Sequence, residues 1–163
     1  FYNFVSLKEG IEKLWKEKGN AISKEIAKIT NFKWKEERIK CYVIGFGRSF
    51  SDPLTIRLYN NKSEFIDTLT HELIHQIQIQ NPKKYKNWLN YTSRTYGKES
   101  VTTKNHIALH AIHYKIYITL FSNINLKRDI DGSVQFSDYK RSWDIVENEG
   151  YEKIINKFLQ VTK

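Results

Sequence analysis

The sequence predicts an α+β domain that is mainly helical, with a small sheet preceding one helix that carries most of the chemistry. Apolar residues recur at helical spacing through most of the chain, whereas two short segments between residues 38 and 59 are rich in β-branched and aromatic residues. The 163 residues contain no internal repeat and no Pro/Gly/Ser-rich linker, so we expect one domain over residues 1–163.

The N-terminal part is expected to contribute two helices and then two strands. Apolar side chains follow helical spacing over residues 7–29, where Gly19 and Asn20 are expected to separate two helices. Residues 38–47 and 54–59 are predicted strands, and the GRSFSDP segment between them has the composition of a turn.

The next predicted helix, residues 64–79, follows the second strand after a short turn. Either Asn61 or Ser63 can cap its first turn, and the Asn81-Pro82 pair is expected to end it. A shorter helix is predicted at residues 85–91.

The C-terminal half is predicted to be helical on both sides of one long loop. Residues 104–121 form a strongly apolar helix. Residues 123–138 are predicted to be loop, with a short hairpin at Asp131-Gly132, and residues 139–159 to form one or two helices.

The chain is basic, with 27 Lys and Arg residues against 18 Asp and Glu residues and a formal net charge of +9. Such a charge attracts anions, which makes nucleic acid a candidate partner. The lysines are spread along the chain without a basic block, as is typical of a solvated surface. Aromatic residues lie between lysines in KKYKNWLNY, residues 83–91. Such aromatics can stack on bases, and a basic amphipathic surface helix explains them equally well.

The sequence also bears on the cellular compartment. No apolar run is long enough to predict a transmembrane helix, and no leader opens the chain. Cys41, the one cysteine, lies in an apolar run, so we expect a buried unreactive thiol and a reducing compartment. These features favour a cytoplasmic protein, while Phe1 in place of Met leaves open a removed leader and a secreted protein.

All five histidines lie in two of the predicted helices. His71 and His75 are four residues apart in THELIHQ, so both imidazoles project from one helix face toward the same cation. Glu72 is angled off that pair, where its carboxylate can reach a water beside the cation without being a ligand. A chance H-E-x-x-H in this composition has a probability of roughly one in a hundred. The motif therefore predicts two ligands of a zinc ion and one general base.

A catalytic zinc ion takes three protein ligands and keeps one position for water. The third is expected from the helix over residues 104–121, in which His106, His110 and His113 share one face. His106 is the preferred ligand, and His113 is the one most typical of a core histidine. Glu99, in the polar stretch before that helix, is the alternative ligand.

The HELIH segment, followed by a second helix that offers a ligand, resembles the zincin superfamily of zinc metallopeptidases over residues 38–121. In its gluzincin branch the second helix carries an Asn-Glu pair and, one turn later, an Asp. NHIALH is similar in layout, with His106 at the Glu position and His110 at the Asp position. A histidine as third ligand also resembles the SprT-like branch, which is associated with DNA–protein crosslinks. The resemblance implies a zincin-like fold and a peptide or protein substrate.

These assignments predict a zinc-dependent metallopeptidase that hydrolyses peptide bonds. The predicted zinc ligands are all histidines: His71, His75 and His106. Glu72 is the general base that takes a proton from the attacking water and passes it to the leaving amine. His110 is expected to donate to the developing oxyanion. The same helix offers three further candidate donors, His113, Tyr114 and Tyr117.

Two supporting elements and one alternative function complete the prediction. Asp67, one turn before His71, is placed to orient that imidazole, and a solvated position on the helix is the alternative. The strand at residues 54–59 is expected to be the sheet edge beside the cleft, where an extended substrate pairs. The alternative is a basic nucleic-acid-associated protein with a structural zinc site, which has no use for a carboxylate at Glu72. A protease recruited to DNA would combine both functions.

Overall fold

The structure is a computed structural model, which describes the backbone of residues 2–163 and the side chains of residues 9–163. Over the described residues, seven helices and three strands follow one another in the order α1 (Tyr2–Thr30), β1 (Tyr42–Ile44), β2 (Phe50–Ser51), β3 (Leu54–Arg57), α2 (Lys62–Gln80), α3 (Pro82–Thr95), α4 (Val101–Leu120), α5 (Asn123–Ser133), α6 (Ser137–Glu149) and α7 (Tyr151–Val161). The α+β class and the small sheet before the H-E-x-x-H helix are confirmed.

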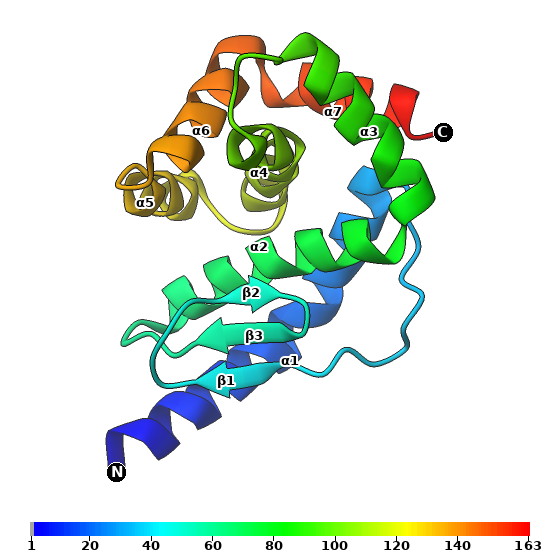
Figure 1. Cartoon of the computed structure of the whole chain (residues 1–163). Coiled ribbons are helices and arrows are strands. Elements are labelled where there is room, and N and C mark those ends of the chain that lie inside the picture. The colour runs from blue at the N-terminus through cyan, green and yellow to red at the C-terminus, as the bar shows by residue number, and fades with distance from the viewer. Residues whose placement is uncertain (1) are drawn as a thin grey trace.

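The small sheet lies on one side of the molecule, and α2 runs between it and the helices of the C-terminal half (Figure 1). The strand order is β1-β3-β2, with β1 parallel and β2 antiparallel to β3. α2 contacts α1, β2 and β3 as well as α4, and α4 packs in turn against α5, α6 and α7. The two helices that carry all five histidines are therefore neighbours in space.

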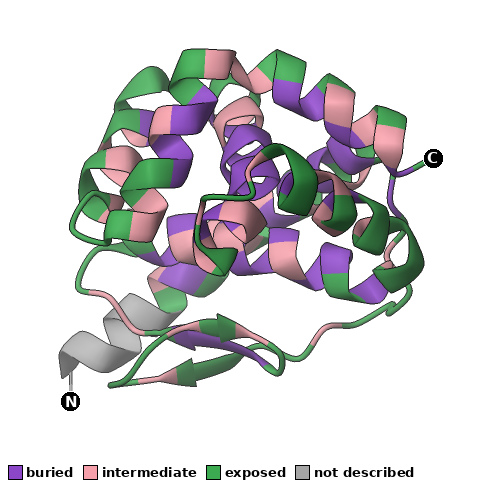
Figure 2. Ribbon diagram, turned by 45° about the horizontal axis from the view of Figure 1, so that its top comes forward, coloured by how far each residue is buried: buried purple, intermediate pink, exposed green. Residues whose placement is uncertain are grey.

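α4 is the central helix of the C-terminal half. Its apolar side chains Ile107, Leu109, Ile112 and Ile116 are fully buried, and Figure 2 shows buried positions all around this helix. A helix that is apolar on every side is covered by other elements, which explains the strongly apolar sequence of α4. No helix among the described residues is long and apolar enough to span a membrane.

α1 is one continuous helix, so the predicted break at Gly19 and Asn20 is wrong. A side chain at position 19 would collide with the Trp15 ring, so glycine is required there for close packing and not for a turn. A glycine inside a helix costs about 1 kcal/mol relative to alanine. Burial of Ile22 and Ile26, each 0% exposed, outweighs that cost. The predicted apolar position Leu7 lies outside the residues whose side chains are described.

The sheet differs from the prediction in three ways. The first predicted strand, residues 38–47, is reduced to the three residues of β1. β2 forms within the segment predicted to be a turn, because Phe50 and Ser51 pair with β3. The second predicted strand is β3, which is the central strand, so the prediction that it forms the sheet edge is wrong. Three consecutive buried residues, 54–56, are typical of such a central strand.

α2 begins and ends close to the predicted positions. The side chain of Asn61 is its N-cap and accepts a hydrogen bond from the backbone N–H of Ser63 at 2.9 Å. Asn81 ends the helix, and Pro82 begins α3 at its first turn, where a missing N–H costs nothing. α3 extends beyond the predicted residues 85–91 in both directions.

The loop and hairpin predicted at residues 123–138 are wrong, because α5 occupies most of that segment. The Ser122 side chain caps α5, and Leu126 is buried against the core with Ile130 packed beside it. Gly132 is accommodated in the last turn of this helix. The closing segment forms two helices, α6 and α7, separated by Gly150 with a φ of 87°, a conformation that favours glycine.

Cys41 is exposed, so the prediction of a buried thiol is wrong. It lies just before β1 at the sheet margin, and the apolar run around it is itself largely solvent-exposed. Nearby protein atoms nevertheless remove enough water to raise the pKa of the thiol to about 11. The thiol is therefore protonated at neutral pH and a weak nucleophile.

Candidate metal centre

α2 and α4 bring three histidines together. His71 and His75 project from α2 and His106 from α4, and one ring nitrogen of each lies within 4.8 Å of the other two. The Nε2 atoms of His75 and His106 are 3.4 Å apart. Two nitrogen ligands at 2.0–2.1 Å from one tetrahedral zinc ion lie about 3.3 Å apart, so this separation fits a shared ion.

The protonation of these imidazoles also suits a metal ion. His106 Nδ1 lies 2.7 Å from the carbonyl oxygen of Thr102, so Nδ1 carries the proton and Nε2 keeps a lone pair. Burial lowers the pKa of all three histidines, that of His75 to about 3 and that of His71 well below its ordinary value. At neutral pH the three rings are therefore uncharged, which is the form that binds metal.

Glu72 lies beside this group and is 8% exposed. Burial raises the pKa of its carboxyl to about 7, because the charged form loses hydration. Among the described residues its carboxylate has no hydrogen bond or ion pair. A carboxyl in this state can gain and lose a proton near neutral pH.

His110 is brought close to the three histidines, with its ring centroid 5.5 Å from that of His106. Its Nδ1 is 2.8 Å from the hydroxyl of Ser142, which in turn donates to the carbonyl oxygen of Tyr139 at 2.8 Å. Since the serine proton is used there, His110 Nδ1 is the donor and its Nε2 accepts. Burial holds the pKa of His110 well below its ordinary value, so the neutral ring offers no proton from Nε2 to an oxyanion.

Tyr139, at the start of α6, is a site residue that the sequence did not indicate. Its ring centroid lies 4.3 Å from that of His106 and 5.8 Å from that of His71. Burial and the carboxylate of Glu72 raise the pKa of its phenol, which therefore stays protonated as a hydrogen-bond donor. The local sequence carries no signal for this role, because the contact depends on how α6 packs across α4.

Glu99, the alternative third ligand, is engaged elsewhere. Arg141 donates to its carboxylate from Nη2 at 2.7 Å and from Nε at 3.1 Å. This ion pair lowers the pKa of Glu99. Glu99 does not belong to the three-residue group that could hold a metal, so the geometry favours His106.

The remaining candidates on α4 lie in the core or pack against it. His113 is 1% exposed, stacks on Tyr117 at 4.7 Å and has its Nδ1 3.4 Å from a carboxylate oxygen of Asp129. Tyr114 stacks on Tyr151 at 4.4 Å. These contacts fit the description of His113 as a core histidine, and they give Tyr114 and Tyr117 packing roles.

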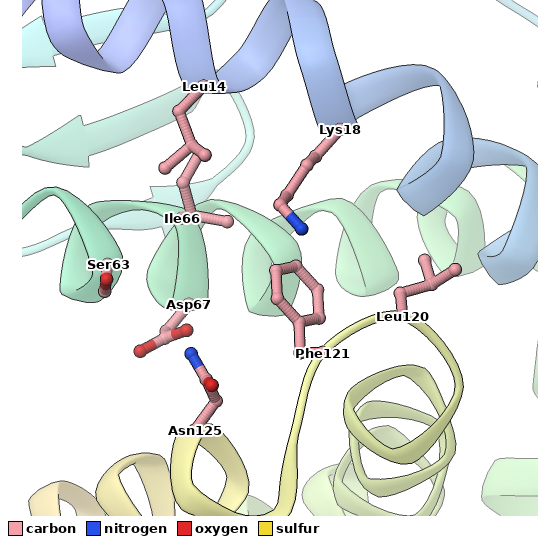
Figure 3. A pocket seen from close by; sticks show the side chains of 8 residues that line it. All are labelled: Leu14, Lys18, Ser63, Ile66, Asp67, Leu120, Phe121 and Asn125. Atoms are coloured by element: carbon pink, nitrogen blue, oxygen red, sulfur yellow. The ribbon is translucent and has the colours of Figure 1, made fainter.

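Asp67 forms an ion pair with Arg128 of α5. Arg128 donates to its Oδ2 from Nε at 3.1 Å and from Nη2 at 2.5 Å. Figure 3 shows Asp67 at a pocket of about 340 Å³, where Ser63 and Asn125 lie nearby. Asp67 therefore ties α2 to α5, and the prediction that it orients His71 stays a prediction.

β2 is the sheet edge nearest to the candidate metal centre. Gln76, the residue after His75, donates a hydrogen bond from its side chain to the carbonyl oxygen of Ser51 in β2. Two aromatic side chains in this region are exposed. Phe50 in β2 is 44% exposed, and Phe136, 51% exposed, has its ring 5.7 Å from that of Tyr139.

No protein-family model matches the chain, and comparisons with curated proteins and with solved structures give no match either.

Proposed function

We propose that the chain is a zinc-dependent metallopeptidase of the zincin type. The observation that carries the proposal is the convergence of three neutral imidazoles, His71, His75 and His106, beside the buried carboxyl of Glu72. Three histidine ligands with a nearby carboxylate that is not a ligand are what a hydrolytic zinc site requires, because one position stays open for water.

When bound, zinc would supply a Lewis acid that polarises the substrate carbonyl and activates water. Glu72 takes the proton of the attacking water and passes it to the leaving amine, a role that its pKa of about 7 suits. The phenol of Tyr139 donates a hydrogen bond to the oxygen on which negative charge develops. Tyr139 replaces His110 in this role, because the neutral His110 ring has no proton to donate from Nε2.

The substrate in this proposal is an extended peptide segment. The free edge of β2 lies beside the metal helix through the contact between Gln76 and Ser51, so a peptide backbone can add to the sheet there. The exposed rings of Phe50 and Phe136 favour apolar side chains on the segment.

Metal content per chain and peptidase activity test the proposal together. Imidazole also suits copper, iron and nickel, so all first-row metals are measured by mass spectrometry after reconstitution. We expect nearly one zinc per chain in wild type, and its loss in His75→Ala and His106→Ala. Glu99→Ala is the matched control and should keep its zinc, because Glu99 pairs with Arg141.

Glu72→Gln separates a catalytic site from a structural one. The variant should keep its zinc and lose activity on an unfolded protein substrate by about 10²–10⁴-fold, the usual contribution of a general base. Zinc absent from reconstituted wild type would overturn the proposal. So would activity that survives Glu72→Gln.

A second candidate function is nucleic-acid binding, which the net charge of +9 favours. The segment at residues 83–91 does not support base stacking through Trp88, which is 1% exposed and packs on Phe158 at 5.4 Å. Binding through lysines alone would weaken steeply between 50 and 200 mM salt, by about 10³-fold or more for six phosphate contacts. A duplex DNA titration at several salt concentrations measures this dependence.

A further inference from the structure

We propose that a second pocket, on the side of α2 away from the metal centre, binds an amphipathic organic cation with an apolar body and an ammonium or guanidinium head. The pocket has a volume of about 650 Å³ and lies between α1, the segment after α1, the sheet and α2. Small-molecule sites usually have volumes of about 300–1,000 Å³. The proposal concerns a different site from the metal centre and does not depend on peptidase activity.

The floor of the pocket is apolar and comes from the back of the metal helix. Phe65, Leu69 and Leu73 of α2 line it, each at most 5% exposed. These positions repeat every four residues and point away from His71 and His75, because the two sets are about half a helical turn apart. The floor therefore accepts an apolar body without touching the histidines.

Two tryptophans form the walls. Trp15 of α1 and Trp34 of the following segment both line the pocket and are only partly buried. An indole face attracts a cation within about 6 Å of the ring, and tryptophan is the strongest of the aromatic residues in this respect. Two indoles that line one pocket with an apolar floor suit an organic cation better than a neutral hydrocarbon.

The charge at the rim has the opposite sign to that of the chain. Glu36 and Glu37 line the pocket with Lys35, so the carboxylates of this segment outnumber its lining ammonium by one. The whole chain carries +9. A local excess of carboxylates on a basic protein attracts cations and disfavours anions.

A bare metal ion does not fit this rim. In the part of the chain that the structure describes, the only group of three or more metal-ligating side chains is that of His71, His75 and His106. The rim carboxylates are therefore too far apart to share one small ion. A cation whose charge is spread over an organic head, with an apolar body behind it, matches both the rim and the floor.

The pocket is held open by hydrogen bonds that fix the segment after α1. The side chain of Gln80, at the end of α2, accepts from the backbone N–H of Lys35 at 2.8 Å and of Glu36 at 3.4 Å. Asn81 donates to the carbonyl oxygen of Lys33 at 2.9 Å, and Trp34 Nε1 donates to that of Ser23 at 3.0 Å. A site fixed in advance loses little free energy to ordering when a ligand binds.

The four tryptophans provide a direct test. The probe is (4-phenylbutyl)trimethylammonium, and 5-phenylpentanoate, with a similar body and a negative head, is its matched control. Both are titrated into the ¹⁵N-labelled full chain while the four indole N–H signals are followed by NMR. We expect saturable shifts for Trp15 and Trp34 with the ammonium probe and none with the carboxylate. Trp88 and Trp143, each 1% exposed, are internal references.

The variants test the role of the rim charge. The double variant Glu36→Gln/Glu37→Gln changes two exposed side chains, so the fold is kept. It should raise the Kd of the ammonium probe by about 5–30-fold, as expected for the loss of two weak charge contacts. Glu147→Gln/Glu152→Gln removes the same charge at exposed positions of α6 and α7 and should leave the Kd unchanged. The proposal is overturned if neither probe binds, if both bind equally, if the shifts appear at Trp143 beside the metal centre, or if both double variants bind alike.

Discussion

The pKa of Glu72 is raised to about 7 because the carboxyl is buried without a hydrogen bond or ion pair from the described residues. Its neighbours His71 and His75 are held neutral by the same burial. One environment thus gives a carboxyl that exchanges protons near neutral pH and imidazoles that keep their lone pairs for a metal ion. At the scale of single residues, desolvation is the largest cause of both properties, and the neighbouring histidines lower the pKa values of His71 and His75 further.

Tyr139→Phe tests the phenol at the same scale. The variant keeps the ring that packs on His106 at 4.3 Å and loses only the hydroxyl. We expect kcat to fall by about 10²-fold, as for loss of one oxyanion donor, with KM and zinc content unchanged. Steady-state kinetics and metal analysis measure the three quantities. A change confined to KM would assign Tyr139 to substrate binding instead.

Asp129→Asn tests how a buried carboxyl sets the pH dependence of stability. Burial raises the pKa of Asp129 to about 7 from an ordinary value of 3.8, although Arg128 opposes the shift. An acid whose pKa is higher in the folded chain binds more protons when folded, so its contribution to stability is lost as pH rises from about 4 to about 7.

The variant should match wild type near pH 4 and be more stable at pH 8, by about 1–2 kcal/mol after allowance for partial exposure. Urea unfolding at a series of pH values measures the difference. Asp131→Asn changes an exposed aspartate of the same helix and is the control. A constant difference across the whole range would contradict the assignment.

At the scale of elements, one side chain links the metal helix to the sheet edge. Gln76 donates to the carbonyl oxygen of Ser51 and so holds β2 against α2. Gln76→Leu removes this hydrogen bond and should raise KM for a peptide substrate by about 5–10-fold, the equivalent of one hydrogen bond. Zinc content should not change. Asn61→Ala is the control, since loss of this cap costs about 1 kcal/mol of stability and leaves KM unaltered.

The helices and strands that could be predicted from the sequence are those whose ends are set by residues adjacent in the chain. α2 begins at the Asn61 cap and ends before Pro82, and both signals are local. β2 could not be predicted because two residues form a strand only where β3 is already in place. α5 was missed for a similar reason, since its helix is stabilised by burial of Leu126 against the core.

The same distinction applies to the candidate site. His71, Glu72 and His75 lie within one helix, so their arrangement follows from helix geometry alone. The preference for His106 over Glu99 depends on how α4 docks on α2 and on the position of Arg141, neither of which has a local signal. Tyr139 depends on the packing of α6, which lies further along the chain from the motif than α4 does.

At the scale of the whole molecule, the candidate metal centre lies between two parts of the chain. α2 packs with the sheet and α4 packs with the three C-terminal helices α5, α6 and α7, while α1 contacts both α2 and α4. His71 and His75 come from the first part and His106 from the second. An ion bound by all three would therefore stabilise the contact between the two parts as well as serve the chemistry.

Removal of the metal should thus destabilise the entire domain. A ligand present at 100 times its Kd stabilises the folded state by about 2.7 kcal/mol, which for a domain of this size corresponds to a Tm change of about 5–10 °C. We expect a chelator to lower the Tm of zinc-loaded wild type by that amount in a calorimetric scan. His106→Ala should show no response to the chelator, because it has lost the ligand that joins α4 to α2, while Glu99→Ala should respond like wild type. A chelator response that persists in His106→Ala would mean that the ion is held by α2 alone and does not link the two halves.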